Sequence, residues 1–376
     1  MTTAGARARL ASLSLRDFRN FERLQLDLPE DGLVLVGENG HGKTNLLEAM
    51  AYLSLLRSVR GARDTDVTRF GAPGFYIEAR AAAPEPRTFS VGFERASKRK
   101  RVRRDGAVIE RLSDALGALP IVMLAPGDVE LVAGAPSARR RFLDIMLALT
   151  SRGYLAALQQ YRAALERRNA ALRDAARHPA RAAAIEVWEP PLALHGAALV
   201  RARVAWVRRV ADRFGALCAR IGETRGVAVR YASGVNPGAE SVEEALSDAL
   251  ASRRAGDLRL GLTQVGPHRD DLTLLLEGRE LRAFGSAGQQ RTAAIALRML
   301  EAEQLRDDRN AAPVFLLDDP FAELDAGRSA RVLAVLQEIG LGQTVLAVPR
   351  DSDIPPALSP LPRYRVVSGS VTAEGA

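Results

Sequence analysis

Short apolar runs alternate with polar turns over the N-terminal part of the chain. Residues 10–50 follow the order strand, turn, strand, glycine-rich loop and helix, and the apolar run at residues 33–36 leads directly into the loop. Further β-rich runs lie between residues 75 and 109, and the last of them turns at Asp105-Gly106. We therefore predict a strand–loop–helix unit flanked by a meandering sheet.

The pattern changes to helical spacing between residues 136 and 222. Apolar side chains recur there at intervals of three or four residues, as at Leu158, Tyr161 and Leu165. The sequence Trp-Glu-Pro-Pro at residues 188–191 interrupts this series. The pattern predicts an antiparallel pair of helices, each about 30 to 45 Å long at a rise of 1.5 Å per residue.

Apolar strands return after Gly261, at residues 272–276 and 314–317, with helices expected at 286–306 and 325–339. We expect the tail beyond Pro349 to end in a strand at 364–367 and a disordered tip. A chain of 376 residues has room for two lobes. We therefore predict an α/β head built from residues 1–135 and 261–376, with a helical lobe of residues 136–260 inserted between them.

The glycine-rich loop has the pattern of a phosphate-binding loop. In such loops, backbone N–H groups and a helix N-terminus face the phosphates, a lysine reaches the terminal phosphates, and a hydroxyl holds magnesium. We expect His41 to contribute mainly its backbone N–H. The predicted nucleotide-binding residues are Gly37, Glu38, Asn39, Gly40, His41, Gly42, Lys43 and Thr44.

Two aspartates end the apolar run at residues 314–317. Hydrolysis of a phosphoanhydride needs charge neutralisation, a magnesium ion and a positioned water. We predict that Asp318 holds the metal together with Thr44, and that Asp319 and Lys43 are the catalytic residues. The alternative is that the acidic pair only caps a helix.

Ser286 precedes a long predicted helix, where Ser286, Gly288 and Gln289 are placed to bind a γ-phosphate through exposed N–H groups. An ordinary helix start is the alternative. Glu323 and Asp325 fall where the helix after the two aspartates begins, and Asp325 either caps that helix or crosses a dimer interface. The order of these motifs predicts an ATPase that completes its active site by dimerising.

The complete set of motifs resembles the RecF family of ABC/SMC-type ATPases that bind DNA. The matching segments are LRDFRNF (15–21), the phosphate loop (37–44), residues 58–63, PSARRRFLD (136–144), GPHRDDL (266–272), SAGQQRT (286–292) and LLDDPFAELD (316–325). The resemblance implies an ABC-type P-loop ATPase head with a short, coiled-coil-like helical lobe, and ATP and Mg²⁺ as cofactors. It also implies that residues 286–289 act in trans on the other subunit's ATP.

The same resemblance implies a function in recombinational repair and replication restart. ATP would join two subunits, and the homodimer would bind duplex DNA at gaps and at junctions of single- and double-stranded DNA. It would then assist a RecA-type recombinase to replace single-strand-binding protein, with a RecR-type protein as partner. Weak, DNA-stimulated ATP hydrolysis would reset it.

Two features depart from the family pattern. Pro320 stands where the family usually has an aliphatic residue, and Ala-Val-Pro-Arg at residues 347–350 replaces a threonine-containing turn expected near the γ-phosphate. We assign no switch residue to this turn. His268 either serves near the nucleotide or the dimer seam, or orients a turn with Asp270 or Asp271.

The net charge of +8 favours an anionic partner such as nucleic acid. Residues 137–230 hold 18 arginines against 7 acidic residues, a net charge of +11, so the helical lobe is a candidate for backbone contact with a duplex. Solvated helix faces, and a charged edge strand at residues 98–104, are the alternatives. The candidate DNA contacts are Arg139, Arg140, Arg141, Lys98, Lys100 and Arg101.

The lone Cys218 excludes an internal disulfide and fits a reducing cytoplasm. We see no leader and no apolar stretch long enough for a membrane span, and expect a cytoplasmic, nucleoid-associated protein without a membrane partner. The ATP-hydrolysing subunit of a transporter-like ABC assembly is a second hypothesis. A small-molecule kinase is a third, but it leaves residues 286–325 unexplained.

Overall fold

The computed structural model describes residues 6–83, 85–322 and 324–374. They form two compact units. The first comprises the described residues of 1–128 with 220–222 and 291–376, and the second comprises 129–219 and 223–290. Helices α7 (Glu189–Ile221) and α10 (Ala287–Arg309) each have residues in both units. Within the described residues, no helix is sufficiently long and apolar for a bilayer crossing.

A six-stranded, mostly parallel sheet organises the first unit, in the order β17-β16-β4-β15-β14-β9. Its strands are β4 (Gly32–Val36), β9 (Ile121–Leu124), β14 (Val314–Asp318), β15 (Thr344–Val348), β16 (Arg363–Val367) and β17 (Ser370–Ala373). The strands β4, β9, β14 and β15 are buried throughout, as expected for unbroken apolar runs covered on both faces.

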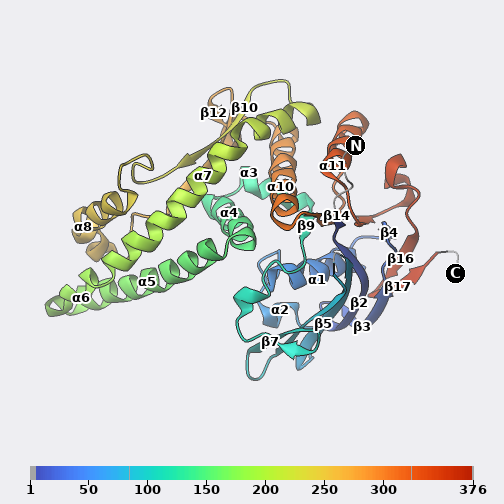
Figure 1. Ribbon diagram of the computed structural model, residues 1–376, viewed down its shortest axis with the longest axis horizontal. Coiled ribbons are helices and arrows are strands. Elements are labelled where there is room, and N and C mark those ends of the chain that lie inside the picture. Colours follow the sequence, from blue (N-terminus) through green and yellow to red (C-terminus); the bar gives the residue numbers. More distant parts are fainter. Residues whose placement is uncertain (1–5, 84, 323, 375–376) are drawn as a thin grey trace. The chain divides into compact units, whose positions relative to one another are not determined.

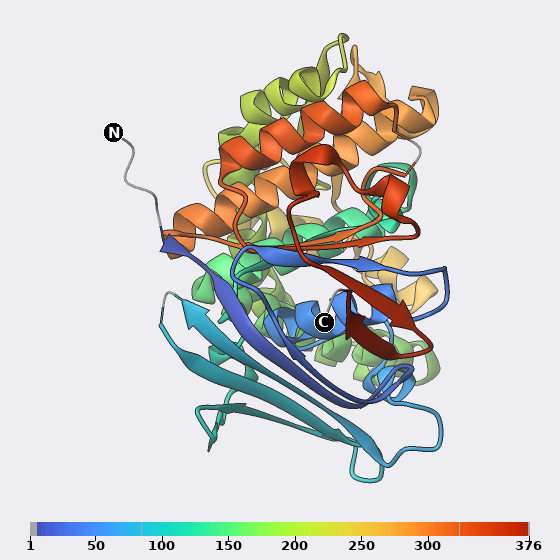
Figure 2. The same ribbon diagram turned by 90° about the vertical axis from the view of Figure 1, so that its right-hand side faces the viewer.

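A second six-stranded sheet is antiparallel, in the order β3-β2-β5-β6-β7-β8. Its strands are β2 (Arg9–Phe18), β3 (Phe21–Asp27), β5 (Gly74–Ala83), β6 (Arg87–Glu94), β7 (Arg99–Arg104) and β8 (Ala107–Val108). Helix α1 (Lys43–Leu55) contacts strands of both sheets and is apolar on nearly every face. It therefore lies between the two sheets, at the centre of the first unit's core (Figure 2).

Helix α11 (Ala326–Ile339) and the end of α10 cover the face of the parallel sheet opposite α1 (Figure 2). Short elements complete this unit: β1 (Ala6–Arg7), which pairs with β13 (Ala311–Ala312), and α2 (Asp64–Val67). The strand expected at 364–367 is present, but residues 370–373 form β17, so the prediction of disorder there was wrong. A tight turn at Ser368-Gly369, both with positive φ, returns the chain to pair with β16.

The second unit is mainly helical. Its helices are α3 (Glu130–Ala133), α4 (Pro136–Thr150), α5 (Arg152–Arg177), α6 (Ala183–Glu186), most of α7, α8 (Val242–Leu260) and α9 (Leu281–Phe284). A sheet of β10 (Val227–Ala232), β11 (Asp271–Leu276) and β12 (Arg279–Glu280) completes it. Residues 261–290, which the sequence pattern groups with the head, lie in this unit because β11 pairs with β10 along its whole length.

Helices α5 and α7 form an antiparallel pair (Figure 1). Tyr154 near the start of α5 contacts Arg203 in α7, whereas Arg168 near the end of α5 contacts Glu189 at the start of α7. At 1.5 Å per residue, α5 and α7 are about 39 and 50 Å long. The prediction of an antiparallel pair is therefore confirmed, with α7 somewhat longer than expected because Pro190 and Pro191 occupy its first turn, where proline is tolerated.

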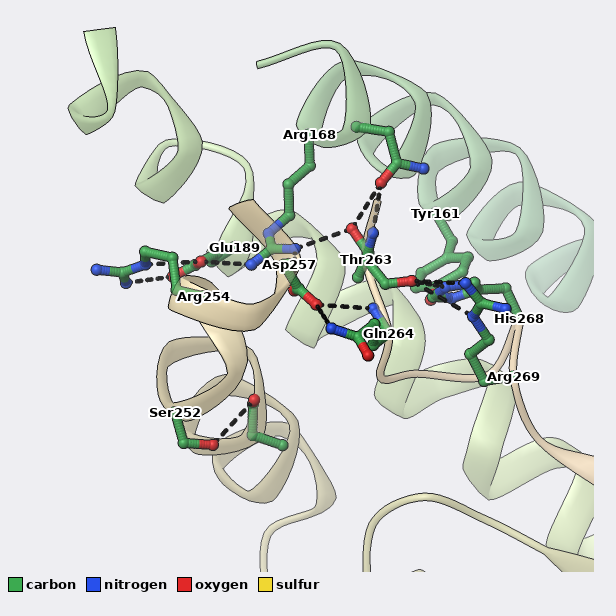
Figure 3. Close-up of polar contacts among 12 residues, drawn as sticks. Tyr161, Arg168, Glu189, Ser252, Arg254, Asp257, Thr263, Gln264, His268 and Arg269 are labelled. Carbon is green, nitrogen blue, oxygen red and sulfur yellow. Dashed lines mark hydrogen bonds and ion pairs between the residues drawn. The ribbon is translucent and has the colours of Figure 1, made fainter. Parts of the chain in front are cut away.

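A buried polar network joins α5, α7, α8 and the chain that follows α8 (Figure 3). Its centre is Arg168, whose side chain is 0% exposed and which donates to Asp257 at 2.7 Å, Thr263 at 2.9 Å and Glu189 at 2.9 Å. Arg254 donates to both carboxylate oxygens of Glu189. Two arginines and two carboxylates thus compensate each other in the interior of the helical lobe.

Candidate functional site

The glycine-rich loop follows β4 and ends where α1 begins, at Lys43. Gly42 has φ of +115°, and a Cβ atom there would lie 2.5 Å from the side-chain nitrogen of Asn20. Gly40 also has a positive φ, of +86°. Glycine is therefore required at the helix entrance both by the backbone conformation and by the close approach of Asn20.

Lys43 lies within its own loop. Its ammonium donates to the carbonyl of Gly37 and, at 2.9 Å, to that of Glu38, and the residue is only 8% exposed. Burial lowers the pKa of Lys43, and the nearby carboxylates of Asp318 and Asp319 oppose this shift. The positive charge is therefore held between the glycine-rich loop and the two aspartates at the end of β14.

Thr44 and Asp318 meet across the ends of β4 and β14. The Thr44 hydroxyl lies 3.0 and 2.8 Å from the two carboxylate oxygens of Asp318. Octahedral magnesium with ligands at about 2.1 Å separates neighbouring oxygens by about 3.0 Å, so two hard oxygen donors at this spacing fit that ion. Burial raises the pKa of the Asp318 carboxyl, and the hydrogen bond from Thr44 opposes this shift.

Asp319 follows directly and adopts a left-handed backbone conformation, with φ of +43°. Its N–H donates to the carbonyl of Ala347 at 2.9 Å, which ties it to the neighbouring strand β15. Burial and then the Asp353 carboxylate raise its pKa, whereas Arg291 and Lys43 counteract the shift. Asp319 is thus a partly buried carboxyl next to Asp318, and Pro320 after it is buried.

Several contacts brace the loop from outside, and the sequence pattern did not single them out. Asn20 donates to the carbonyl of His41 at 3.0 Å and accepts from Asn45 at 2.8 Å. The His41 ring accepts from the N–H of Ser368 at 3.0 Å, which joins the loop to the turn between β16 and β17. His41 therefore contributes its side chain as well as its backbone.

Glu48 in α1 is fully buried and pairs with Arg19 through two hydrogen bonds of 2.9 and 3.0 Å. It also accepts from the hydroxyl of Ser58. The segments LRDFRNF and 58–63 are thereby joined to the helix behind the phosphate loop. A carboxylate inside an apolar helix pattern was the available signal, because a buried charge requires a partner.

Ser286 and Gln289 form a reciprocal capping box at the start of α10. The Ser286 N–H donates to the Gln289 side chain at 2.8 Å, and the Gln289 N–H donates to the Ser286 hydroxyl at 3.4 Å. Ser286 is exposed, and Gly288 is partly so. These residues belong to the second unit, and their action on a partner's ATP stays a prediction.

Asp325 caps α11, because its carboxylate accepts from the N–H of Arg328 at 2.8 Å. This is the capping alternative that the sequence left open. Glu323, in the same motif, lies outside the described residues. By contrast, Asp318 contacts Thr44 of α1 and the Asp319 N–H contacts Ala347 of β15, so neither caps the helix that follows them.

The arginines of PSARRRFLD are largely internal. Arg139 is 5% exposed and forms two 2.8 Å bonds with the Asp271 carboxylate and one of 2.9 Å with the Gly134 carbonyl. Arg140 donates to the Asp270 carbonyl at 2.8 Å, and burial lowers the pKa of both Arg140 and Arg141. We therefore leave Arg139 out of any DNA-contacting surface, because its guanidinium is used within the fold.

The basic strand β7 divides by its two faces. Lys100 points inward, where it pairs with Asp64 at 2.9 Å and lies over the Tyr52 ring, leaving its side chain 16% exposed. Lys98 and Arg101 are exposed, and so are Arg99 and Arg103 on the face that Arg101 shares. Of the candidates in this segment, Lys98 and Arg101 remain available to DNA, and Lys100 is an internal brace.

His268 bonds within the second unit (Figure 3). Its Nε2 lies 3.0 Å from the Thr263 carbonyl, which can only accept, so Nε2 carries the proton and Nδ1 accepts from Tyr161 at 2.6 Å. Burial lowers the pKa of His268 and favours this neutral form. The neighbouring Asp270 accepts from Tyr231 and Ser233. GPHRDDL is thus a structural turn in this unit.

Comparison with known proteins agrees with this geometry. The family described as "AAA domain" matches residues 12–116. The DNA replication and repair protein RecF of Frankia alni is 37% identical over 380 residues, covering 96% of this chain and 98% of its own. The RecF protein of Salinibacter ruber is 34% identical and covers 94% of this chain and 88% of its own. The chain belongs to the RecF family.

Solved structures give the same result for the fold. The recombination mediator protein RecF-ATPrS in the RecFOR pathway superposes with a TM-score of 0.90 at 27% identity, covering 99% of this chain and all of its own. The Smc head domain of Pyrococcus furiosus superposes at 0.55 with 16% identity, over 97% of this chain and 96% of its own, which shows a shared fold alone. The expected ABC-type ATPase head fold is therefore confirmed.

Proposed function

We propose that this protein is an ATP-gated DNA-binding protein of recombinational repair. The observation that carries the proposal is the meeting of Lys43, Thr44, Asp318 and Asp319 at the carboxyl ends of β4 and β14, which flank β15, in a chain of the RecF family. A relative of this family has been solved as a RecF-ATP complex with a TM-score of 0.88, which supports ATP as the nucleotide here.

Each residue has a defined task in this proposal. The N–H groups of the loop at 37–44 cradle the phosphates, and Lys43 turns from its loop carbonyls to the terminal phosphates. Thr44 and Asp318 hold Mg²⁺, which neutralises charge on the phosphates when bound. Asp319, with its raised pKa, accepts the proton of the attacking water.

The second site needed for gating is the capping box of α10. We propose that Ser286, Gly288 and Gln289 of one subunit bind the γ-phosphate held by another, so that ATP joins two copies of this chain. The exposure of Ser286 supports this role, since it leaves the N-terminus of α10 accessible to a phosphate held by another subunit. Hydrolysis removes the γ-phosphate and opens the dimer, so the slow rate of hydrolysis sets how long the dimer stays closed.

We propose that the protein binds duplex DNA at gaps and at junctions of single- and double-stranded DNA, without sequence preference. The exposed basic face of β7, with Arg99, Arg101 and Arg103, and the adjoining Lys98 support backbone contact in the first unit. The solved relatives are named as recombination mediators of the RecFOR pathway, which supports a role in recombination here. We propose that the complex assists a RecA-type recombinase, with a RecR-type partner, at the nucleoid, and that DNA stimulates hydrolysis.

The decisive test is fluorescence anisotropy of a labelled duplex titrated with the protein, with and without ATP and Mg²⁺, while light scattering reports the dimer. We expect duplex affinity and dimers to appear together and only with ATP. Lys43→Ala should abolish both because nucleotide binding is lost. ATP binding without dimers or DNA affinity would refute the proposal and favour a transporter-like ATPase subunit.

Ser286→Arg separates the trans role from nucleotide binding. The monomer should bind ATP with unchanged affinity but fail to dimerise, because the new side chain obstructs the partner's γ-phosphate. Ser252→Arg is the matched control, since Ser252 is an exposed serine of the same unit that bonds only within α8. Loss of monomer ATP affinity in Ser286→Arg would contradict a role in trans.

A further inference from the structure

The strand β15 lies between β4, which leads into the phosphate loop, and β14, which ends at Asp318. All three strands are parallel, and Ala347 pairs with Leu35 on one side and with Asp318 on the other. Ligands of such sheets bind beyond the carboxyl ends of the strands. The chain that leaves β15 at Val348 therefore emerges between the phosphate loop and the two aspartates.

Arg350 is the second residue of that emerging chain. Its Nε and Nη2 donate to the two carboxylate oxygens of Asp353, both at 3.1 Å, and its side chain is 77% exposed. The segment itself is anchored, because Asp351 pairs with Arg365 of β16 at 2.6 Å. Among the described residues, the exposed Arg350 side chain is thus hydrogen-bonded to a carboxylate three residues away, on an anchored backbone.

The electrostatics connect this pair to the catalytic carboxyl. Burial raises the pKa of Asp319 most, the Asp353 carboxylate raises it further, and Arg350 is among the cations that lower it. The hydrogen bonds from Arg350 to Asp353 raise the pKa of Arg350 most, and the Asp319 carboxylate raises it further. The charges of Arg350, Asp353 and Asp319 therefore interact, at the edge of the sheet where the phosphates are expected.

We propose that Arg350 is a ligand of the γ-phosphate and that Asp353 holds its guanidinium when no γ-phosphate is bound. The inference rests on the ATP site proposed above. A guanidinium forms two parallel bonds with phosphate as well as with carboxylate, so the side chain can exchange one partner for the other. A single ion pair whose arginine is 77% exposed contributes little to stability, and the exchange therefore meets little resistance.

This assignment gives the protein a means of distinguishing ATP from ADP within one subunit. With ATP, Arg350 leaves Asp353 and binds the terminal phosphate. With ADP it remains on Asp353, because ADP offers no group in that position. No covalent step is involved, and the charge that moves is that of a single side chain.

The experiment compares dissociation constants for a non-hydrolysable ATP analogue and for ADP, both with Mg²⁺, by isothermal titration calorimetry. Hydrogen bonds to charged groups predict at least about tenfold weaker binding of the analogue by Arg350→Ala, with ADP affinity unchanged. Asp353→Asn should strengthen analogue binding because Arg350 is released. This gain should vanish in the double variant Arg350→Ala/Asp353→Asn.

Arg87→Ala is the matched control, because Arg87 is an exposed arginine paired with Glu85 and Asp105 in the antiparallel sheet. It should leave both affinities unchanged. Equal affinities of the wild type and Arg350→Ala for the analogue, or equal losses for both nucleotides, would overturn the assignment of Arg350 alone. A wild-type protein that binds no ATP analogue would instead refute the proposed ATP site, so the two failures are distinguishable.

Discussion

Arg168→Met tests whether the buried network of the helical lobe stabilises it by charge compensation. The substitution keeps a long side chain but removes three hydrogen bonds, to Asp257, Thr263 and Glu189. Glu189 retains Arg254, whereas fully buried Asp257 retains only hydrogen bonds from the backbone N–H and side-chain amide of Gln264. Removing one partner of a buried pair costs about 3–5 kcal/mol, so we expect a loss in that range.

Urea unfolding followed by circular dichroism measures this loss. With a slope of about 2–3 kcal/mol per molar urea, the midpoint of the lobe's transition should fall by about 1–2.5 M. Arg168→Met/Asp257→Leu should recover much of the stability, because it removes both charges instead of stranding one. ATP affinity should be unaffected, since the phosphate loop lies in the other unit.

Arg181→Ala serves as the control, because Arg181 forms an exposed pair with Asp174 in the same lobe. It should cost at most about 1 kcal/mol. If Arg168→Met cost no more than this control, or if the double variant were less stable than the single one, the charge-compensation argument would be refuted.

Three further predictions follow from individual side chains. Gly42→Ala should lower ATP affinity and reduce the free energy of unfolding by at least about 1 kcal/mol, because the new Cβ would clash with Asn20 and because position 42 has a positive φ. Nucleotide titration measures the affinity and urea unfolding the stability, and no change in either would contradict the predicted strain. Cys218 is buried, and burial raises its thiol pKa to about 12, so a thiol reagent at pH 8 should react only with unfolded protein; fast native labelling would disprove this. Burial raises the pKa of Glu189, but hydrogen bonds from Arg254 and Arg168 hold it below its ordinary value. The Glu189 carboxylate therefore stabilises the folded state fully above about pH 4.5, and this contribution is lost as the pH falls further. Glu189→Gln should make the urea midpoint less dependent on pH in that acid range.

Local patterns explain how much of the phosphate site could be predicted. The loop at 37–44 and the aspartates at 318–319 each follow an apolar run, and parallel strands bring their carboxyl ends to one edge of a sheet. The positions of Lys43, Thr44 and Asp318 therefore followed from the order of residues alone. Asn20 and Glu48 were not predicted, because their roles depend on contacts between segments far apart in the sequence.

The basic residues show what composition cannot provide. Charge counts marked residues 137–230 as a surface for DNA, yet Arg139, Arg168 and Arg203 are buried and paired with carboxylates. The sequence reveals the charge of a side chain but not the direction in which it points. In β7 the alternation of the strand separates inward Lys100 from outward Arg101, so the period of two was an available signal there.

Hydrogen bonds and ion pairs of buried arginines connect the motifs PSARRRFLD and GPHRDDL. Arg139 pairs with Asp271 at the first residue of β11, and Arg203 joins Asp144 to the carbonyl of Pro267. The chain that they fix runs through β11, β12 and α9 to the capping box at Ser286. Polar groups with defined geometry hold a strand in one register, whereas apolar contacts tolerate small shifts. The role proposed for Ser286 requires a position fixed to within a hydrogen-bond length, which such polar contacts supply. We therefore propose that Arg139 and Arg203, which are buried in this unit, help to position Ser286.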